Sequence, residues 1–160
     1  MELTDSSLNI FTKSQPLCPI IVCIGSPNVS GDSFGPITGQ LLCDFFKVPT
    51  FVYGTVLSPV TALNLKRALD FIKIKHRGRK IIAVDSAVGQ ASGDKLRFFY
   101  GPLSPGKATG KSLPSLGDFS ITATVNDSVT ALFTTGLKDI YPLARSVAYA
   151  VNHAIRLRTQ

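Results

Sequence analysis

The chain has 160 residues, of which 44% are apolar, and this is enough for one domain with a hydrophobic core. No apolar run approaches the roughly 20 residues of a membrane span, and the acidic, polar N-terminus lacks the pattern of a signal peptide. We therefore predict a cytoplasmic protein with no membrane partner. Seventeen Lys and Arg against ten Asp and Glu give a formal net charge of +7.

The first elements predict a strand, a loop and a helix. Residues 1–18 lack periodicity and are expected to form a flexible arm, followed by a single domain over residues 19–160. Residues 20–24 are apolar and mostly β-branched, which favours a buried strand. A small polar loop over 25–31 follows, with Asp32 where it turns into a helix. The helix is indicated by apolar residues at helical spacing: Phe34, Ile37, Leu41, Leu42 and Phe45.

The next segments continue the alternation of strands and helices. We expect a strand at 50–54, a helix at 59–75 and a third apolar strand at 80–85, which ends in Asp85. The order βαβαβ implies a parallel sheet with right-handed crossovers. Because ligands gather at the carboxyl ends of the strands in such sheets, this edge is the first place to look for a site.

The segment 73–80 holds the densest group of basic residues in the chain. Cations at the end of a helix complement its dipole, which is an ordinary structural role. No RNA- or DNA-binding motif accompanies the group, so nucleic acid is not predicted as the primary partner. The cysteines Cys18, Cys23 and Cys43 form no CxxC pair and no zinc-ligand spacing, and we expect small buried hydrophobes.

The second half begins with an expected edge strand at 95–100, because that segment opens with charges. A long loop at 101–117 is rich in Gly, Pro, Lys and Ser, and loops of this length are often functional. A strand at 119–125, a short helix at 126–135 and a last helix from Asp139 to about residue 158 complete the pattern. We predict an α/β fold, a three-layer α/β/α sandwich with a mostly parallel sheet.

Two familiar motifs give no support for a site. The loop at 25–31 contains neither GxxxxGK[ST] nor GxGxxG, so no nucleotide site is predicted. Residues 31–35 fit GxSxG with Ser33 as the nucleophile, but several loop residues separate this motif from the strand. A triad would also need His76, in the basic segment, or His153, on the expected solvent face of the last helix. A serine hydrolase is disfavoured.

The pair Asp32 and Asp85 is the stronger candidate. If the first and third strands are neighbours, both acids lie at one edge of the sheet. Two close carboxylates cannot both ionise freely, so the pair could hold one proton and activate water, or bind a divalent metal. The alternatives are structural, with Asp32 as a helix N-cap and Asp85 bonding to a loop. Asp118 and Asn126 are expected on the same rim.

Ordered sequence blocks resemble the YyaC-like family of sporulation proteins. They run from about residue 19 almost to the C-terminus and include residues 31–36 (GDSFGP), 53–55 (YGT), 83–85 (AVD), 105–106 (PG) and 117–118 (GD). That family is similar to the spore germination protease and, more distantly, to hydrogenase maturation proteases. The resemblance implies their phosphorylase/hydrolase-like fold.

The resemblance also implies roles for individual residues. Asp32 and Asp85 match the two aspartates to which an atypical aspartic peptidase activity is attributed, and Pro105-Gly106 matches a loop near that active site. We expect the substrate-binding residues to be Gly31, Ser33, Pro105, Gly106, Asp118 and Asn126. The maturation proteases hold nickel with acids at the same two positions and a histidine, but residues 86–118 contain no histidine. No metal is therefore predicted, although a divalent ion at Asp32 and Asp85 stays open.

The leading hypothesis is an aspartate-dependent peptidase of sporulation or germination. Its partner would be a protein or peptide substrate, such as a spore protein, and a homo-oligomer is open. The first alternative is a non-catalytic binding or assembly protein that keeps the fold. The second is a metal-dependent endopeptidase of the maturation type.

Overall fold

The computed structural model describes residues 17–89 and 95–159. Of the predicted arm, only Leu17 and Cys18 belong to the described residues. Within the described ranges, no helix has both the length and the apolar character needed to cross a bilayer.

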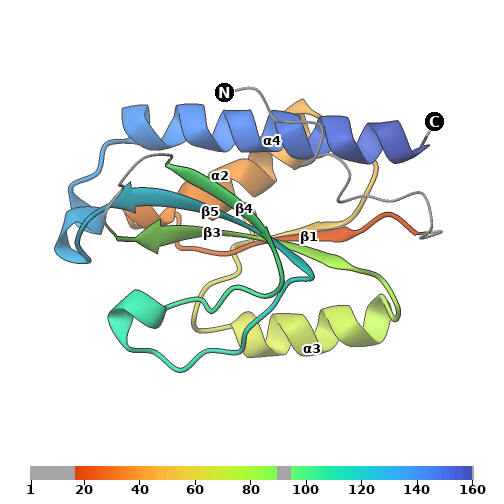
Figure 1. The fold of residues 1–160 in the computed structure, drawn as a ribbon, viewed down its shortest axis with the longest axis horizontal. Coiled ribbons are helices and arrows are strands. Elements are labelled where there is room, and N and C mark those ends of the chain that lie inside the picture. The colour runs from red at the N-terminus through yellow and green to blue at the C-terminus, as the bar shows by residue number, and fades with distance from the viewer. Residues whose placement is uncertain (1–16, 90–94, 160) are drawn as a thin grey trace.

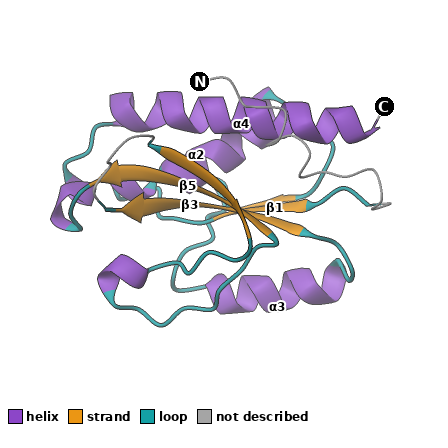
Figure 2. Cartoon of the chain, viewed as in Figure 1, coloured by secondary structure: helices purple, strands orange, loops and turns teal. Residues whose placement is uncertain are grey.

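The centre of the molecule is a five-stranded sheet in the order β2-β1-β3-β5-β4. Its strands are drawn in orange in Figure 2. The strands are β1 (Ile20–Cys23), β2 (Val52–Tyr53), β3 (Ile81–Val88), β4 (Leu96–Tyr100) and β5 (Phe119–Asn126). All neighbours are parallel except β4, which pairs antiparallel with β5 at the edge. The predictions of a mostly parallel sheet and of a charged edge strand are confirmed.

Helices cover both faces of the sheet, as Figure 1 shows. One layer contains α2 (Phe34–Gln40), its continuation as the π-helix η2 (Leu41–Phe45), and the long α4 (Leu137–Thr159). The opposite layer contains α3 (Leu65–Lys75). Short 3-10 turns occur at η1 (Ser30–Asp32), η3 (Lys107–Thr109) and η4 (Thr130–Phe133). The predicted three-layer sandwich is confirmed.

Two apolar clusters hold these layers together, because alternate side chains of a strand point to opposite faces. Ile21, Cys23 and Val84 face α2 and α4, whereas Val22 and Ala83 face α3. The fully buried Cys23 behaves as a small hydrophobe, since burial strongly raises the pKa of its thiol. This agrees with the prediction for that residue.

The helix α3 begins six residues later than predicted, at Leu65 instead of residue 59. The side chain of Asn64 accepts a hydrogen bond from the Thr61 backbone N–H (2.9 Å), which folds the preceding residues into a turn. Leu63 is 97% exposed and Phe71 is 50% exposed, so neither belongs to the buried face. The buried face is formed by Leu65, Leu69 and Ile72, at helical spacing.

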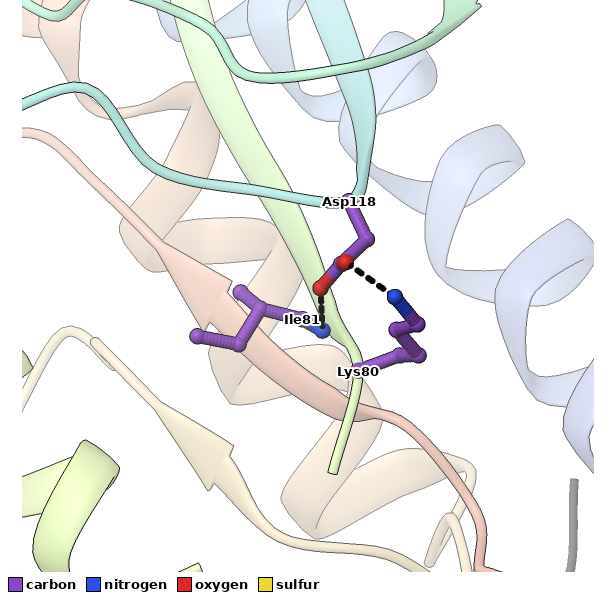
Figure 3. Close-up of polar contacts among 3 residues, drawn as sticks. All are labelled: Lys80, Ile81 and Asp118. Atoms are coloured by element: carbon purple, nitrogen blue, oxygen red, sulfur yellow. Dashed lines mark hydrogen bonds and ion pairs between the residues drawn. The ribbon is translucent and has the colours of Figure 1, made fainter. Parts of the chain in front are cut away.

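Asp118 lies at the end of the sheet where the parallel strands begin, in contact with Lys80 and Ile81 (Figure 3). Its carboxylate accepts hydrogen bonds from the Ile81 backbone N–H (2.9 Å) and from Lys80 Nζ (2.7 Å). The residue precedes β5, so it lies beside the start of β3 and not where the parallel strands end. The prediction that Asp118 lines the same rim as Asp85 is wrong, because strand direction places it at the opposite edge.

Two substitutions at Asp118 separate its two contacts. Asp118→Ala leaves the Ile81 N–H without its acceptor and should lower the free energy of unfolding by about 1–2 kcal/mol. Asp118→Asn keeps an acceptor oxygen and loses only an exposed ion pair, so its cost should stay below about 1 kcal/mol. Urea denaturation measures both. Equal losses for the two variants would contradict the role given to the backbone contact.

Candidate active site

The site is built where β3 runs past the end of β1. The last residue of β1, Cys23, pairs with Val84, and β3 continues to Val88. Asp85 therefore lies within β3, level with the end of β1, and not at the end of its strand as predicted. The carboxyl-terminal part of β3 is thus open on the β1 side to the loop that follows β1.

That loop folds back closely onto the strand it leaves. Gly25 has a φ of +143°, and a Cβ there would lie 2.1 Å from the carbonyl oxygen of Asp32. A Cβ at Gly35 would lie 2.0 Å from the carbonyl oxygen of Ile24. Only glycine fits such close backbone approaches. Together these contacts bring Asp32, at the end of η1, next to β3.

Both carboxylate oxygens of Asp32 have hydrogen-bond donors. The Ser26 backbone N–H donates to Oδ2 (2.7 Å), and the Ser86 hydroxyl donates to Oδ1 (3.2 Å). The N-cap of α2 is Ser33. Asp32 is thus not the cap of α2 but a bridge between its own loop and β3. Ser86 was not among the predicted site residues, although its position directly after Asp85 was a signal.

The two carboxyl groups have unequal environments. Asp85 is 8% exposed, and burial, followed by the negative charge of Asp32, raises its pKa well above the ordinary value. Burial also raises the pKa of Asp32, but the Ser26 N–H, the Ser86 hydroxyl and the positive charge of Lys111 oppose this rise. Asp85 therefore keeps its proton to a higher pH than Asp32, which is how a pair divides into an acid and a base.

Gly31 and Ser33 are buried and take part in packing and local hydrogen bonding. Gly31 is buried, and a Cβ there would lie 2.7 Å from the Cα of Leu132 in η4. Ser33 is 2% exposed and donates its hydroxyl hydrogen to the Ser30 carbonyl (2.6 Å). Substrate binding by these two residues stays a prediction, and the disfavoured serine nucleophile gains no support.

The remaining predicted residues are Pro105 and Gly106, on the loop that follows β4, and Asn126, at the end of β5. The carbonyl of Gly106, after the buried Pro105, accepts from the backbone N–H groups of Thr109 (3.0 Å) and Lys111 (3.2 Å). The Pro-Gly turn thus shapes the segment that carries Lys111, and direct substrate binding by it stays a prediction. Asn126 pairs with Val88 at the carboxyl end of β5, and its side chain lies outside the described part of the structure.

The pair itself offers two carboxylates as ligands for a metal ion. Among the described residues, no three His, Cys, Asp or Glu side chains gather where they could hold a metal. His76 instead forms a 2.7 Å hydrogen bond with the Tyr53 hydroxyl, and His153 is exposed on α4, as predicted. Two carboxylates fall short of the three protein ligands common in catalytic zinc sites.

Comparisons with known proteins agree with the family and the fold inferred above. Residues 3–150 match the family model described as "Protein of unknown function (DUF1256)". The "Uncharacterized protein YyaC" of Bacillus subtilis (strain 168) is 38% identical over 110 residues, which is 68% of this chain and 54% of that protein. The chain thus spans about half the length of this curated relative. The resemblance to the YyaC-like family is confirmed.

Two solved structures are similar to this chain, and the one with the higher TM-score supports the fold. A [NiFe] hydrogenase maturation protease, HycI from Thermococcus kodakarensis, superposes with a TM-score of 0.51 at 17% identity, covering 87% of this chain and 92% of that one. An uncharacterized protein from Wolinella succinogenes gives a TM-score of 0.47 at 14% identity, covering 86% and 96%. The predicted likeness to the maturation-protease fold is confirmed, whereas the likeness to the spore germination protease stays a prediction.

The raised pKa of Asp85 predicts a pH-dependent stability. Between its unfolded and folded pKa values, the folded chain binds a proton that the unfolded chain has released, so the free energy of unfolding falls as pH rises through this window. The stability that the protonated acid provides is complete below the unfolded pKa. Asp85→Asn imitates the protonated acid and should remove this loss, about 1.4 kcal/mol for each unit of raised pKa.

Denaturation curves of the parent and of Asp85→Asn from pH 4 to pH 9 test this expectation. Asp139→Asn, at an exposed acid in the first turn of α4, controls for the loss of one negative charge. If the parent and Asp85→Asn lost stability in parallel as pH rose, burial of Asp85 would not control the pH dependence.

Proposed function

We propose that this chain, which belongs to the family described as "Protein of unknown function (DUF1256)", is an aspartate-dependent endopeptidase that acts on a protein or peptide. The observation that carries the proposal is the unequal pair of carboxyl groups. Asp32 is hydrogen-bonded at both oxygens, and Asp85 is almost fully buried beside its charge. Such a pair supplies a base and an acid to one reaction centre.

The proposed reaction uses both groups in turn. Ionised Asp32 takes a proton from a water molecule, whose oxygen attacks the carbonyl carbon of the scissile peptide bond. Protonated Asp85 gives its proton to the carbonyl oxygen, which yields a tetrahedral gem-diol. Asp32 then protonates the leaving nitrogen, Asp85 recovers a proton from a hydroxyl of the diol, and the C–N bond breaks. Both carboxyl groups return to their starting states.

The relatives support the type of activity only indirectly. The solved structure from T. kodakarensis is that of a [NiFe] hydrogenase maturation protease, and at 17% identity it supports a shared fold. The relative from B. subtilis is described as uncharacterized. A role in sporulation or germination, with a spore protein as substrate inside the cell, is therefore part of our proposal and rests on the sequence resemblance.

One observation favours a second candidate, a non-catalytic binding or assembly protein. Asp85 is only 8% exposed, so a substrate could reach it only if the adjoining loops moved. Such burial is also the usual state of a structural acid. The metal-dependent alternative gains no support, because among the described residues no third His, Cys, Asp or Glu joins the two carboxylates as a possible metal ligand.

Substitution of the pair tests the peptidase. Asp32→Asn and Asp85→Asn should each lower the rate of cleavage by about 10²–10⁴-fold, because each removes a group that transfers a proton. Cleavage is measured by mass spectrometry on a peptide library digested from a complete proteome. The parent should show a bell-shaped pH profile, since the base must be ionised while the acid is protonated.

The Ser33→Ala variant is the matched control and should keep its activity, because the Ser33 hydroxyl donates to the Ser30 carbonyl of its own turn and not to either carboxyl group of the pair. Unchanged cleavage in Asp85→Asn would show that the pair is not catalytic. If the parent cleaved no peptide but bound a protein tightly, the second candidate would replace the first.

A further inference from the structure

Basic side chains gather where the parallel strands of the sheet begin, at the end of the sheet opposite Asp32 and Asp85. We call this end the amino edge. The helices α3 and α4 both end at this edge (Figure 1), and their last turns carry Lys73, Lys75, Arg156 and Arg158. The helix dipole accounts for a cation in each last turn. It does not account for the aromatic rings that lie between these cations.

Contacts among backbone and side chains make this surface continuous. From α4, Arg156 donates to the carbonyl groups of Phe46 and Lys47 (3.0 Å each). From the loop after α3, Arg79 donates to the Thr50 hydroxyl (3.0 Å) and lies 5.3 Å from the ring centroid of Phe51. The segment from 46 to 51 thus joins the ends of α4 and α3.

Within this segment, Lys47 occupies a position that favours glycine. Its φ is +48°, and among the described residues it is the non-glycine residue with a positive φ. The Val48 N–H bonds to the Leu42 carbonyl (3.0 Å), one residue further back than the bond that closes an α-helix beside a left-handed residue, because η2 is a π-helix. Lysine here costs stability relative to glycine and supplies an exposed cation instead.

Exposed rings flank this cation. Phe45 is 66% exposed and Tyr149 is 60% exposed, and both contact Phe46 ring to ring at centroid distances of 4.9 and 6.2 Å. Tyr149 also lies parallel to His153, with 5° between the ring planes. At the other end of the surface, Phe51 is 49% exposed. Phe45, Phe46 and Tyr149 thus form one aromatic cluster at the end of the surface that carries Lys47 and Arg156, and Phe51 lies against Arg79 at the other end.

We propose that this surface, the amino-edge belt of Phe45, Lys47, Phe51, Arg79, Tyr149 and Arg156, binds single-stranded nucleic acid. Cations that follow a backbone of phosphates, together with rings on which bases stack, are the features that such ligands need. A lipid surface would favour apolar side chains gathered on one helix face, whereas these rings come from the 45–51 segment and from α4 and lie beside cations. An acidic protein would match the positive charge of this surface, but its carboxylates would not stack on the aromatic rings as bases do.

The proposal is independent of peptidase activity, because the belt lies at the opposite edge of the sheet from the two carboxyl groups. It adds a second site to a chain for which composition alone did not favour nucleic acid as the primary partner. The net charge of +7 assists association with any polyanion, so the test must separate the belt from general attraction.

Fluorescence anisotropy of a labelled 20-nucleotide oligothymidylate, titrated with the full 160-residue chain at several salt concentrations, is the test. Lys47→Gln should weaken binding and reduce the slope of affinity against salt by about 1, since one phosphate contact is lost. Phe45→Ala should weaken binding by roughly fivefold or more, since one stacking ring is lost. Lys107→Gln, which removes an exposed charge on η3, is the matched control and should change little.

A third variant separates binding from stability. Lys47→Gly should raise the melting temperature, because glycine adopts a positive φ without strain, while affinity falls as it does for Lys47→Gln. A loss of binding in a more stable protein cannot come from unfolding.

Three results would overturn the proposal. The first is no binding by the parent at low salt. The second is a loss of binding in Lys107→Gln equal to that in Lys47→Gln, which would indicate net charge alone. The third is competition by polyglutamate, a DNA duplex or anionic vesicles as strong as that by the oligonucleotide, which would assign the belt to another class of partner.

Discussion

The arrangement of this protein's candidate site depends on the two hydrogen bonds that Asp32 accepts. One comes from the Ser26 backbone within its own loop, and the other comes from Ser86 on β3. The loop after β1 can return to the sheet only because Gly25 and Gly35 permit close backbone contact. The carboxylate then fastens the loop to the part of β3 that extends beyond β1. The position of Asp32 thus depends both on the close backbone contacts at the two glycines and on the hydrogen bonds of its own side chain.

This fastening also determines how the pair divides its charge. The donors that hold Asp32 favour its ionised form, and that charge in turn disfavours ionisation of the buried Asp85. The same hydrogen bonds therefore serve the fold and separate the two pKa values. Without a substrate, the geometry of the pair is the same whether Asp85 is structural or catalytic, because both roles place a buried acid beside the fixed carboxylate of Asp32. What distinguishes them is access of a substrate to Asp85.

Sequence reasoning found the pair for a sound topological reason. The alternation of strands and helices implies that β1 and β3 are neighbours, which brings the acids that follow or end them to one edge. Sequence reasoning was wrong where strand direction or a local hydrogen bond determines the position of a residue. Asp118 precedes its strand and so lies at the other edge, and Asn64 bonds back to Thr61 and delays the start of α3. The extension of β3 past Asp85 also escaped prediction, because Ser86 and Ala87 carry no strong strand signal.

The two edges of the sheet carry opposite chemistry, and the topology explains why both are available. A parallel sheet sends every strand's carboxyl end to one side and returns each helix to the other, so helix C-termini collect at the amino edge. Cations that complement those helix ends accumulate there without disturbing the carboxyl groups. The distinctive step in this chain is the use of the left-handed position at Lys47 for a charge, where glycine would give the more stable helix end. A site for an anionic partner can thus be added to the fold at a local cost in stability, while the acids at the far edge keep their own environment.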